Sequence, residues 1–140
     1  MDLTRLSLVR YGRSMPVLLL DTHALLWALS DPERLAEAAR EALRDGGNEV
    51  LGSAASAWEL AIKRATGKLT APDDLLEVTA AAGFDWLPIS ARHATVAGAL
   101  PPHHRDPFDR MLVAQARLES LTLVTRDQRF AAYGVELLAA

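Results

Sequence analysis

Short apolar runs alternate along the chain with longer stretches in which apolar residues recur every three or four positions. The short runs predict strands at residues 17–20, 49–52, 84–89 and 121–125, with residues 135–138 as a candidate fifth strand. They fit the length of strands rather than of helices, and polar or glycine-containing segments bound most of them. The run Val17-Leu18-Leu19-Leu20 has no polar position, which is typical of a buried strand.

The longer stretches predict helices, most of which begin at a capping residue. They span residues 24–29, 33–44, 54–66, 72–82, 91–98 and 108–119, with a short helix at residues 127–133. Ser53 and Ser90 are suited to cap helices, and Asp31-Pro32 and Asp106-Pro107 each place a proline after a capping carboxylate. The predicted apolar faces are Leu35, Ala38, Ala39, Ala42 and Leu43 in one helix, and Ala54, Trp58, Ile62 and Ala65 in another.

Strands that alternate with helices predict an α/β fold. We expect a three-layer α/β/α sandwich around a central, mostly parallel sheet of four or five strands, with right-handed crossovers. In such sheets, reactive groups collect beyond the carboxyl ends of the strands, where the strand order reverses. Asp21 and Asp127 follow strands closely, so the sequence places both at that edge.

Composition narrows the class of protein. A chain of 140 residues, half of them hydrophobic, predicts one globular domain, and the absence of cysteine excludes disulfides and thiolate metal sites. The net charge of −3 requires any nucleic-acid contact to use a local patch. No apolar stretch approaches the roughly 20 residues of a membrane span, so we expect no membrane partner.

The first residues differ from the rest of the chain. Arg5, Arg10 and Arg13 interrupt the apolar positions near the N-terminus, which argues against an export signal and favours the cytoplasm. Met15 directly precedes the first strand. We therefore expect the domain to span residues 15–140 and residues 1–14 to be an extension, with a short basic arm that touches RNA or a partner as the alternative.

Four acids stand where an apolar run ends or a helix begins: Asp21, Glu59, Asp109 and Asp127. If the fold brings them together, their mutual repulsion raises each pKa unless a cation lies among them. Magnesium or manganese suits such a cluster, because both prefer oxygen ligands. A bound metal ion can polarise a phosphodiester and lower the pKa of a water molecule. The sequence thus indicates a metal-dependent hydrolase.

Each acid also has a simpler explanation. Asp21 and Asp127 can cap the helices that follow them, and Glu59 can form a surface ion pair with Lys63 one turn later. Asp106 suits a plain N-cap, and Asp109 lies in a first turn, where the helix dipole favours an acid. Taken singly, these explanations compete with a metal site.

The segments around the acids are more specific. They are VLLLDTHALLW (17–27), SAASAWELAIKRATGKL (53–69), HHRDPFDRMLVAQA (103–116) and LVTRDQRF (123–130). Together, and in this order, they resemble the PIN-domain nucleases, specifically the VapC-type toxins of type II toxin–antitoxin systems. The resemblance covers about residues 15–138. It implies a PIN-like fold, a Mg²⁺- or Mn²⁺-dependent endoribonuclease, neutralisation by a VapB-like antitoxin, and a homodimer.

The resemblance also assigns the acids. Asp21, Glu59, Asp109 and Asp127 match the four catalytic acids of the family in that order. We expect Asp21 and Asp109 to bind the metal directly, with Glu59 and Asp127 as supporting ligands, partly through water. Asp106 is the rival of Asp109, but the register of Asp109 with Leu112, Val113 and Ala116 favours Asp109 as the inward acid.

Several neighbours of the acids allow two interpretations. We expect Thr22 to cap a helix, with a role at the metal or a phosphate as the alternative, and Thr125 to orient Asp127 or touch a phosphate. We expect His23 to be a structural, hydrogen-bonded histidine rather than a base. His103 and His104 are adjacent, a poor spacing for two ligands of one metal, and are expected in a solvent-exposed loop or near the RNA entry.

Two further groups of side chains remain open between a structural and a functional role. The tryptophans, Trp27, Trp58 and Trp86, are expected in the core, with Trp58 as the possible exception beside Glu59. The cations near the acids form either an RNA-binding rim that grips phosphates or solvated helix faces: Lys63, Arg64, Lys68, Arg105, Arg110, Arg126 and Arg129. Leu26, Leu29 and Leu35 belong either to a dimer or antitoxin surface or to the core.

The alternative functions are an acid-cluster phosphatase or phosphotransfer domain, and a catalytically inactive PIN-like binding module. A phosphatase of the haloacid-dehalogenase kind needs an aspartate two residues after Asp21, where this chain has His23. A receiver domain needs paired acids around the first strand and a lysine after the last, and neither is present. A catalytically inactive PIN-like binding module is disfavoured because all four acids are retained.

Overall fold

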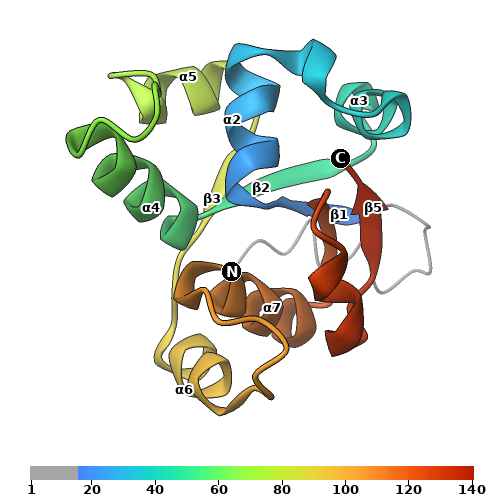
Figure 1. Ribbon diagram of the computed structural model, residues 1–140. Coiled ribbons are helices and arrows are strands. Elements are labelled where there is room, and N and C mark those ends of the chain that lie inside the picture. Colours follow the sequence, from blue (N-terminus) through green and yellow to red (C-terminus); the bar gives the residue numbers. More distant parts are fainter. Residues whose placement is uncertain (1–15) are drawn as a thin grey trace.

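The computed structural model describes residues 16–140, so the predicted extension at residues 1–14 lies outside the described part of the chain. At its centre is a five-stranded sheet of order β3-β2-β1-β4-β5, in which every neighbouring pair is parallel (Figure 1). The strands are β1 (Val17–Leu20), β2 (Glu49–Ser53), β3 (Asp85–Leu87), β4 (Thr122–Thr125) and β5 (Leu137–Ala139). The predicted parallel α/β sheet is therefore confirmed.

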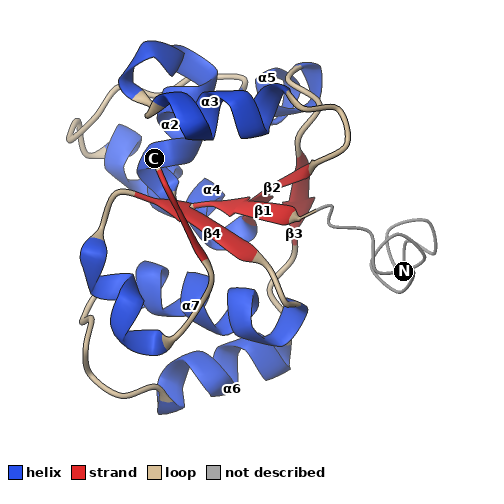
Figure 2. Cartoon of the chain, turned by 90° about the vertical axis from the view of Figure 1, so that its right-hand side faces the viewer, coloured by secondary structure: helices blue, strands red, loops and turns tan. Residues whose placement is uncertain are grey.

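Helices cover both faces of this sheet. On one side lie α2 (Thr22–Ser30), α3 (Glu37–Arg44) and α5 (Leu75–Ala81), and on the other lie α6 (Ala91–Ala99) and α7 (Pro107–Glu119) (Figure 2). The helix α4 (Ala54–Ala65) follows β2 and contacts both α2 and α7. Two short 3-10 helices, η1 (Pro32–Arg34) and η2 (Gln128–Tyr133), complete the described part. The arrangement is the predicted three-layer sandwich.

The central strand β1 divides the core into two halves. Val17 and Leu19 belong to the cluster under α6 and α7, whereas Leu18 and Leu20 belong to the cluster under α2 and α3. Successive side chains of a strand point to opposite faces, so a strand buried on both faces is apolar at every position. This explains the uninterrupted run VLLL and places Asp21, the next residue, at the end of the sheet.

The predicted helix over residues 33–44 is wrong in its first third. The chain forms η1, then leaves helical geometry at Leu35 and Ala36, whose ψ angles are 147° and 149°, and only then begins α3. The break turns Leu35 into the core, where its side chain is buried. It also leaves the Arg34 carbonyl free to accept a hydrogen bond from the Arg126 guanidinium. Packing of Leu35 thus overrides the local helical preference.

The predicted apolar face of α4 is also wrong. Trp58 and Ile62 are exposed, and the buried face is formed by Ala55, Ser56, Glu59 and Leu60. The expectation that Trp58 lies in the core is corrected accordingly, whereas Trp27 and Trp86 are partly buried against the core. Leu35 is a buried core residue, and Leu26 and Leu29 are partly buried against the same cluster. Within residues 16–140, no helix has the length and apolarity to cross a membrane.

Candidate active site

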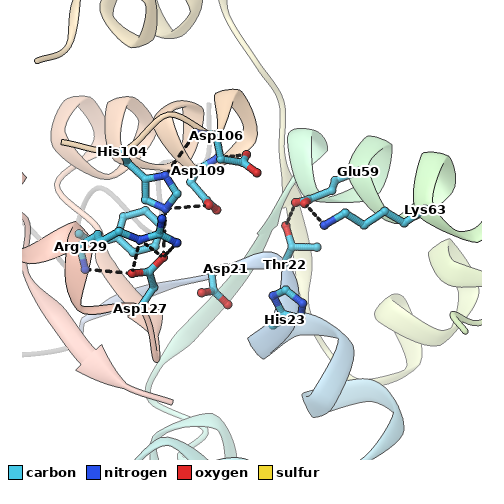
Figure 3. A pocket seen from close by; sticks show the side chains of 11 residues that line it. Asp21, Thr22, His23, Glu59, Lys63, His104, Asp106, Asp109, Asp127 and Arg129 are labelled. Carbon is cyan, nitrogen blue, oxygen red and sulfur yellow. Dashed lines mark hydrogen bonds and ion pairs between the residues drawn. The ribbon is translucent and has the colours of Figure 1, made fainter. Parts of the chain in front are cut away.

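The four acids reach one pocket at the carboxyl ends of the central strands. The cavity has a volume of about 290 Å³ and is lined by Asp21, Thr22, His23, Glu59, Lys63, His104, Asp106, Asp109, Asp127, Arg129 and Phe130. In Figure 3, Asp21 lies between two groups of side chains, one around Glu59 and the other around Asp109 and Asp127. The neighbouring parallel strands β1 and β4 explain why Asp21 and Asp127 meet at this edge.

Asp21 is held in place from two sides. Its Oδ1 accepts a hydrogen bond of 2.8 Å from the backbone N–H of Ala24, so it caps α2, and its Oδ2 accepts one of 2.5 Å from Thr125 Oγ1. The capping role expected as the simpler explanation is therefore present, and it coexists with a place in the pocket. Burial raises the pKa of Asp21, although the hydrogen bonds from Thr125 and Ala24 oppose that shift.

Glu59 projects from the buried face of α4. Its Oε1 accepts a hydrogen bond of 2.6 Å from Thr22 Oγ1, and its Oε2 forms an ion pair of 2.6 Å with Lys63 Nζ. The expected pair between Glu59 and Lys63 exists, but Glu59 is buried and the pair lines the pocket rather than the outer surface. Thr22 is the first residue of α2, not its cap, and its hydroxyl also lies 2.9 Å from Ser56 Oγ.

Asp106 and Asp109 come from the start of α7. Asp106 Oδ1 accepts hydrogen bonds from the backbone N–H groups of Phe108, at 2.8 Å, and Asp109, at 3.1 Å, so Asp106 is the N-cap of this helix. Asp109 is one turn further in and half-buried. Burial raises the pKa of Asp109 to about 7, and the charges of Asp106, Glu59, Asp21 and Asp127 contribute in the same direction. The carboxylates are thus close enough to repel one another.

Asp127 lies on the far side of the pocket. Arg129 donates to both of its carboxylate oxygens, with distances of 2.8 Å from Nη2 and 3.0 Å from Nε, and this bidentate pair lowers the pKa of Asp127 well below its usual range. The Oδ1 atom also accepts from the Arg129 backbone N–H at 2.9 Å, which caps η2. The backbone N–H of Asp127 donates to Thr125 Oγ1 at 3.0 Å, as expected of a threonine that orients Asp127.

The sequence interpretation missed the burial of His104 and its contacts with two of the acids. We expected a solvent-exposed loop or a place near the RNA entry, but the side chain is only 2% exposed, and its Nε2 lies 3.0 Å from both Asp109 Oδ2 and Asp127 Oδ2. Its neighbour His103 is exposed. His23 is also exposed; it lines the pocket, with its ring 5.8 Å from that of Trp27. The periodicity of a helix or strand offers no signal for His104, because it lies in a loop.

Of the seven cations that the sequence left open between an RNA-binding rim and solvated helix faces, two line the pocket. Lys63 and Arg129 line the pocket. Arg64 pairs with Asp73 instead, and Arg110 donates to backbone carbonyl groups, including those of Ala97 and Leu100. Arg126 lies over the Trp27 ring at 4.4 Å. The last three arginines therefore have structural partners.

The donor set suits a hard divalent cation. Asp21, Glu59, Asp109 and Asp127 present carboxylate oxygens to one cavity, and among the described residues 16–140 only Lys63 and Arg129 supply positive charge to its lining. Burial raises the pKa of Asp109, and the charges of the neighbouring acids add to that shift. Magnesium and manganese prefer such oxygen ligands. Among residues 16–140, His104, Asp109 and Asp127 each offer one potential ligand atom, and these three atoms lie within 4.8 Å of one another.

Comparisons with known proteins identify the family of the chain. The sequence model of the PIN domain matches residues 18–136. Ribonuclease VapC22 of Mycobacterium tuberculosis is 33% identical over 123 residues, covering 82% of this chain and 90% of the relative.

Solved structures show the same fold. The structure of DNA-bound VapBC from Salmonella typhimurium includes a chain with a TM-score of 0.66 and 20% identity, covering 89% of this chain and 98% of that one. A chain of VapBC2 from Rickettsia felis, bound to a DNA fragment from its promoter, has a TM-score of 0.63 and 16% identity. The match covers 88% of this chain and 98% of that one. The expected family is confirmed, and the chain belongs to the PIN domain family.

Proposed function

We propose that this protein is a divalent-metal-dependent endoribonuclease and the toxin of a type II toxin–antitoxin pair. One observation carries the proposal: acids from four separate segments line one pocket, and their burial and mutual repulsion raise the pKa of Asp109 to about 7. A strained carboxylate cluster of this kind is the expected state of a cation site before the cation binds. The name of the ribonuclease relative supports RNA as the substrate.

The roles of the acids follow the sequence assignment. Asp21 and Asp109 would hold Mg²⁺ or Mn²⁺ directly, and Glu59 and Asp127 would complete the site, partly through water. When bound, the ion supplies a Lewis acid and lowers the pKa of a water molecule. Thr125 and Thr22 fix the carboxylates of Asp21 and Glu59 by short hydrogen bonds, so these acids are oriented in advance.

The same pocket offers contacts to the substrate backbone. Lys63 and Arg129 pair with the outer acids of the cluster and lie beside the cavity. Their charges would attract phosphate groups without reading bases.

RNA cleavage by purified protein tests the proposal. Wild type with Mg²⁺ or Mn²⁺ should generate new 5′ ends at defined positions, and Asp21→Asn should abolish them. Asp31→Asn is the matched control, because Asp31 is an exposed aspartate that caps η1 without a side-chain hydrogen bond. Equal cleavage by wild type and Asp21→Asn would refute the assignment. Loss of cleavage in both Asp21→Asn and Asp31→Asn would refute it too, because the effect would then not be specific to Asp21.

A VapB-like antitoxin and a second copy of the chain complete the proposal, with the cytoplasm as the place of action. Two of the similar solved structures are of DNA-bound VapBC and VapBC2, which supports such a partner. Expression of the chain should arrest growth, and co-expression of the adjacent small gene should restore it. Sedimentation of the purified Asp21→Asn protein should show a dimer, and a monomer at all concentrations would contradict that part.

A further inference from the structure

We propose that His104 is a positioning residue that holds Asp109 and Asp127 together for the cation by donating a single Nε2–H to both carboxylates. The inference rests on the proposed metal-dependent function. It concerns a residue outside the four acids, and it assigns His104 the role of a neutral donor rather than of a metal ligand. Three observations support it: the tautomer, the anchoring of the ring, and the two elements that it joins.

The hydrogen bonds identify the tautomer. The backbone N–H of Asp106 donates to His104 Nδ1 at 3.3 Å, so Nδ1 carries a lone pair and the proton of the neutral ring lies on Nε2. That Nε2–H faces two acceptors at 3.0 Å, Asp109 Oδ2 and Asp127 Oδ2. A nitrogen that donates cannot ligate a metal at the same time. His104 is therefore a hydrogen-bond donor to two proposed metal ligands. It does this although it lies close enough to Asp109 and Asp127 to bind the same ion.

The ring has little freedom to move. The His104 backbone N–H donates to the Tyr133 hydroxyl at 2.9 Å, which in turn donates to the Pro101 carbonyl at 2.7 Å. The ring also stands 5.4 Å from that of Phe130. Because the side chain is buried, the Nε2–H has a fixed direction toward the pocket (Figure 3). Preorganised partners of this kind set the orientation of metal ligands.

The two carboxylates come from different elements. Asp109 belongs to α7, whereas Asp127 follows β4 and caps η2. A neutral donor brings the two carboxylates together and leaves their negative charge intact. A lysine or arginine in that position would cancel part of that charge. The pocket thus keeps both a short separation between the two acids and a strong attraction for a divalent cation.

Manganese binding to the RNA-free protein tests this role without relying on cleavage. By calorimetry, His104→Leu should weaken Mn²⁺ affinity by about 10- to 100-fold, and His104→Gln, which retains an N–H donor, should recover most of the loss. His103→Leu is the matched control, because His103 is the exposed neighbour in the same loop. Unchanged affinity in His104→Leu, or a loss in His104→Gln as large as in His104→Leu, would overturn the inference.

A spectroscopic test uses the unmodified protein. The ¹⁵N imidazole shifts of His104 should report a proton on Nε2 and none on Nδ1, both before and after Mg²⁺ is added. An Nδ1–H tautomer, or loss of the Nε2 proton on addition of Mg²⁺, would show that His104 is a ligand and overturn the inference. If wild type binds no divalent ion at all, the proposed function fails. If wild type and His104→Leu bind equally, only the role of His104 fails.

Discussion

Thr125 donates a hydrogen bond of 2.5 Å to Asp21 across two neighbouring strands. The two residues are 104 positions apart in sequence and stand at the carboxyl ends of β4 and β1. The Thr125 hydroxyl also accepts from the backbone N–H of Asp127 at 3.0 Å. One threonine therefore fixes two acids of the pocket, which makes the end of β4 a supporting element of the site.

Replacement of Thr125 by valine should destabilise the fold and impair the site. The change leaves a buried Asp21 oxygen without its donor, and we expect the free energy of unfolding to fall by about 1–3 kcal/mol. Chemical denaturation and RNA cleavage should both report the loss. Thr125→Ser retains the hydroxyl and should behave like wild type, and Thr122→Val tests the same change elsewhere on β4. A fully active and stable Thr125→Val protein would contradict the account.

The pH dependence of stability follows from Asp109. Its pKa is 3.8 in the ordinary case and about 7 in the folded protein, so the folded state binds the extra proton between these values. Stability of the metal-free protein should therefore fall as pH rises through this window, and the penalty should be complete above about pH 7. The raised pKa of Asp21 acts in the same direction, whereas the lowered pKa of Asp127 contributes stability that is lost only in acid.

Thermal denaturation at about pH 5.5 and about pH 8 measures this effect. Mg²⁺ should raise Tm more at the higher pH, because Asp109 is ionised there and the ion relieves its repulsion. Asp109→Asn, which has no charge to titrate, should flatten much of the difference. A Mg²⁺ effect that is equal at both pH values in wild type would exclude a link between Asp109 and the cation.

Arg129 competes with a cation for Asp127. Arg129→Gln removes a positive charge from the pocket, so the pKa of Asp127 should rise toward its ordinary value and Mn²⁺ affinity should increase about fivefold. Carboxyl ¹³C titration and calorimetry give the two values. Arg117→Gln, an exposed position near the end of α7, is the matched control. If the pKa of Asp127 stays unchanged in Arg129→Gln, the bidentate pair with Arg129 is not the cause of the lowered pKa.

The buried face of α4 contains Leu60 and not Trp58, so we expect substitutions at these two positions to lower the free energy of unfolding by different amounts. Trp58 is 64% exposed and meets Phe108 edge-on at 5.4 Å, so Trp58→Ala should cost about 0.5–1.5 kcal/mol of unfolding free energy. Leu60 is 1% exposed, and Leu60→Ala should cost about 2–5 kcal/mol. Urea denaturation of the two variants compares them directly. A larger loss of unfolding free energy in Trp58→Ala than in Leu60→Ala would show that Trp58 lies on the buried face of α4, as expected from the sequence.

The sequence predicted the sheet well because its signals are local. The run before Asp21 is apolar at every position, and capping residues mark several helix starts, including Ser53 before α4, Ser90 before α6 and Asp106 before α7. These features predict strands, helices and the edge where the acids meet. The four acids stand out in the sequence by their positions at run ends and helix starts, the family resemblance assigned their roles, and the structure brings them to one pocket.

Other features depend on packing between distant segments. Ala54, Trp58, Ile62 and Ala65 repeat at helical spacing, but the face with Ser56 and Glu59 is buried because it meets Thr22 of α2. Hydrophobicity alone favours the wrong face. The break at Leu35 and the burial of His104 likewise arise from contacts with segments far along the chain, which no local pattern encodes.

Removal and return of the metal tests the central claim most directly. Metal-stripped wild-type protein should leave RNA intact, addition of Mg²⁺ or Mn²⁺ should restore cleavage, and Asp109→Asn should stay inactive at every metal concentration that restores wild type. Cleavage at an undiminished rate by protein stripped with a chelator would contradict the account, because the four acids would then have no cation to hold.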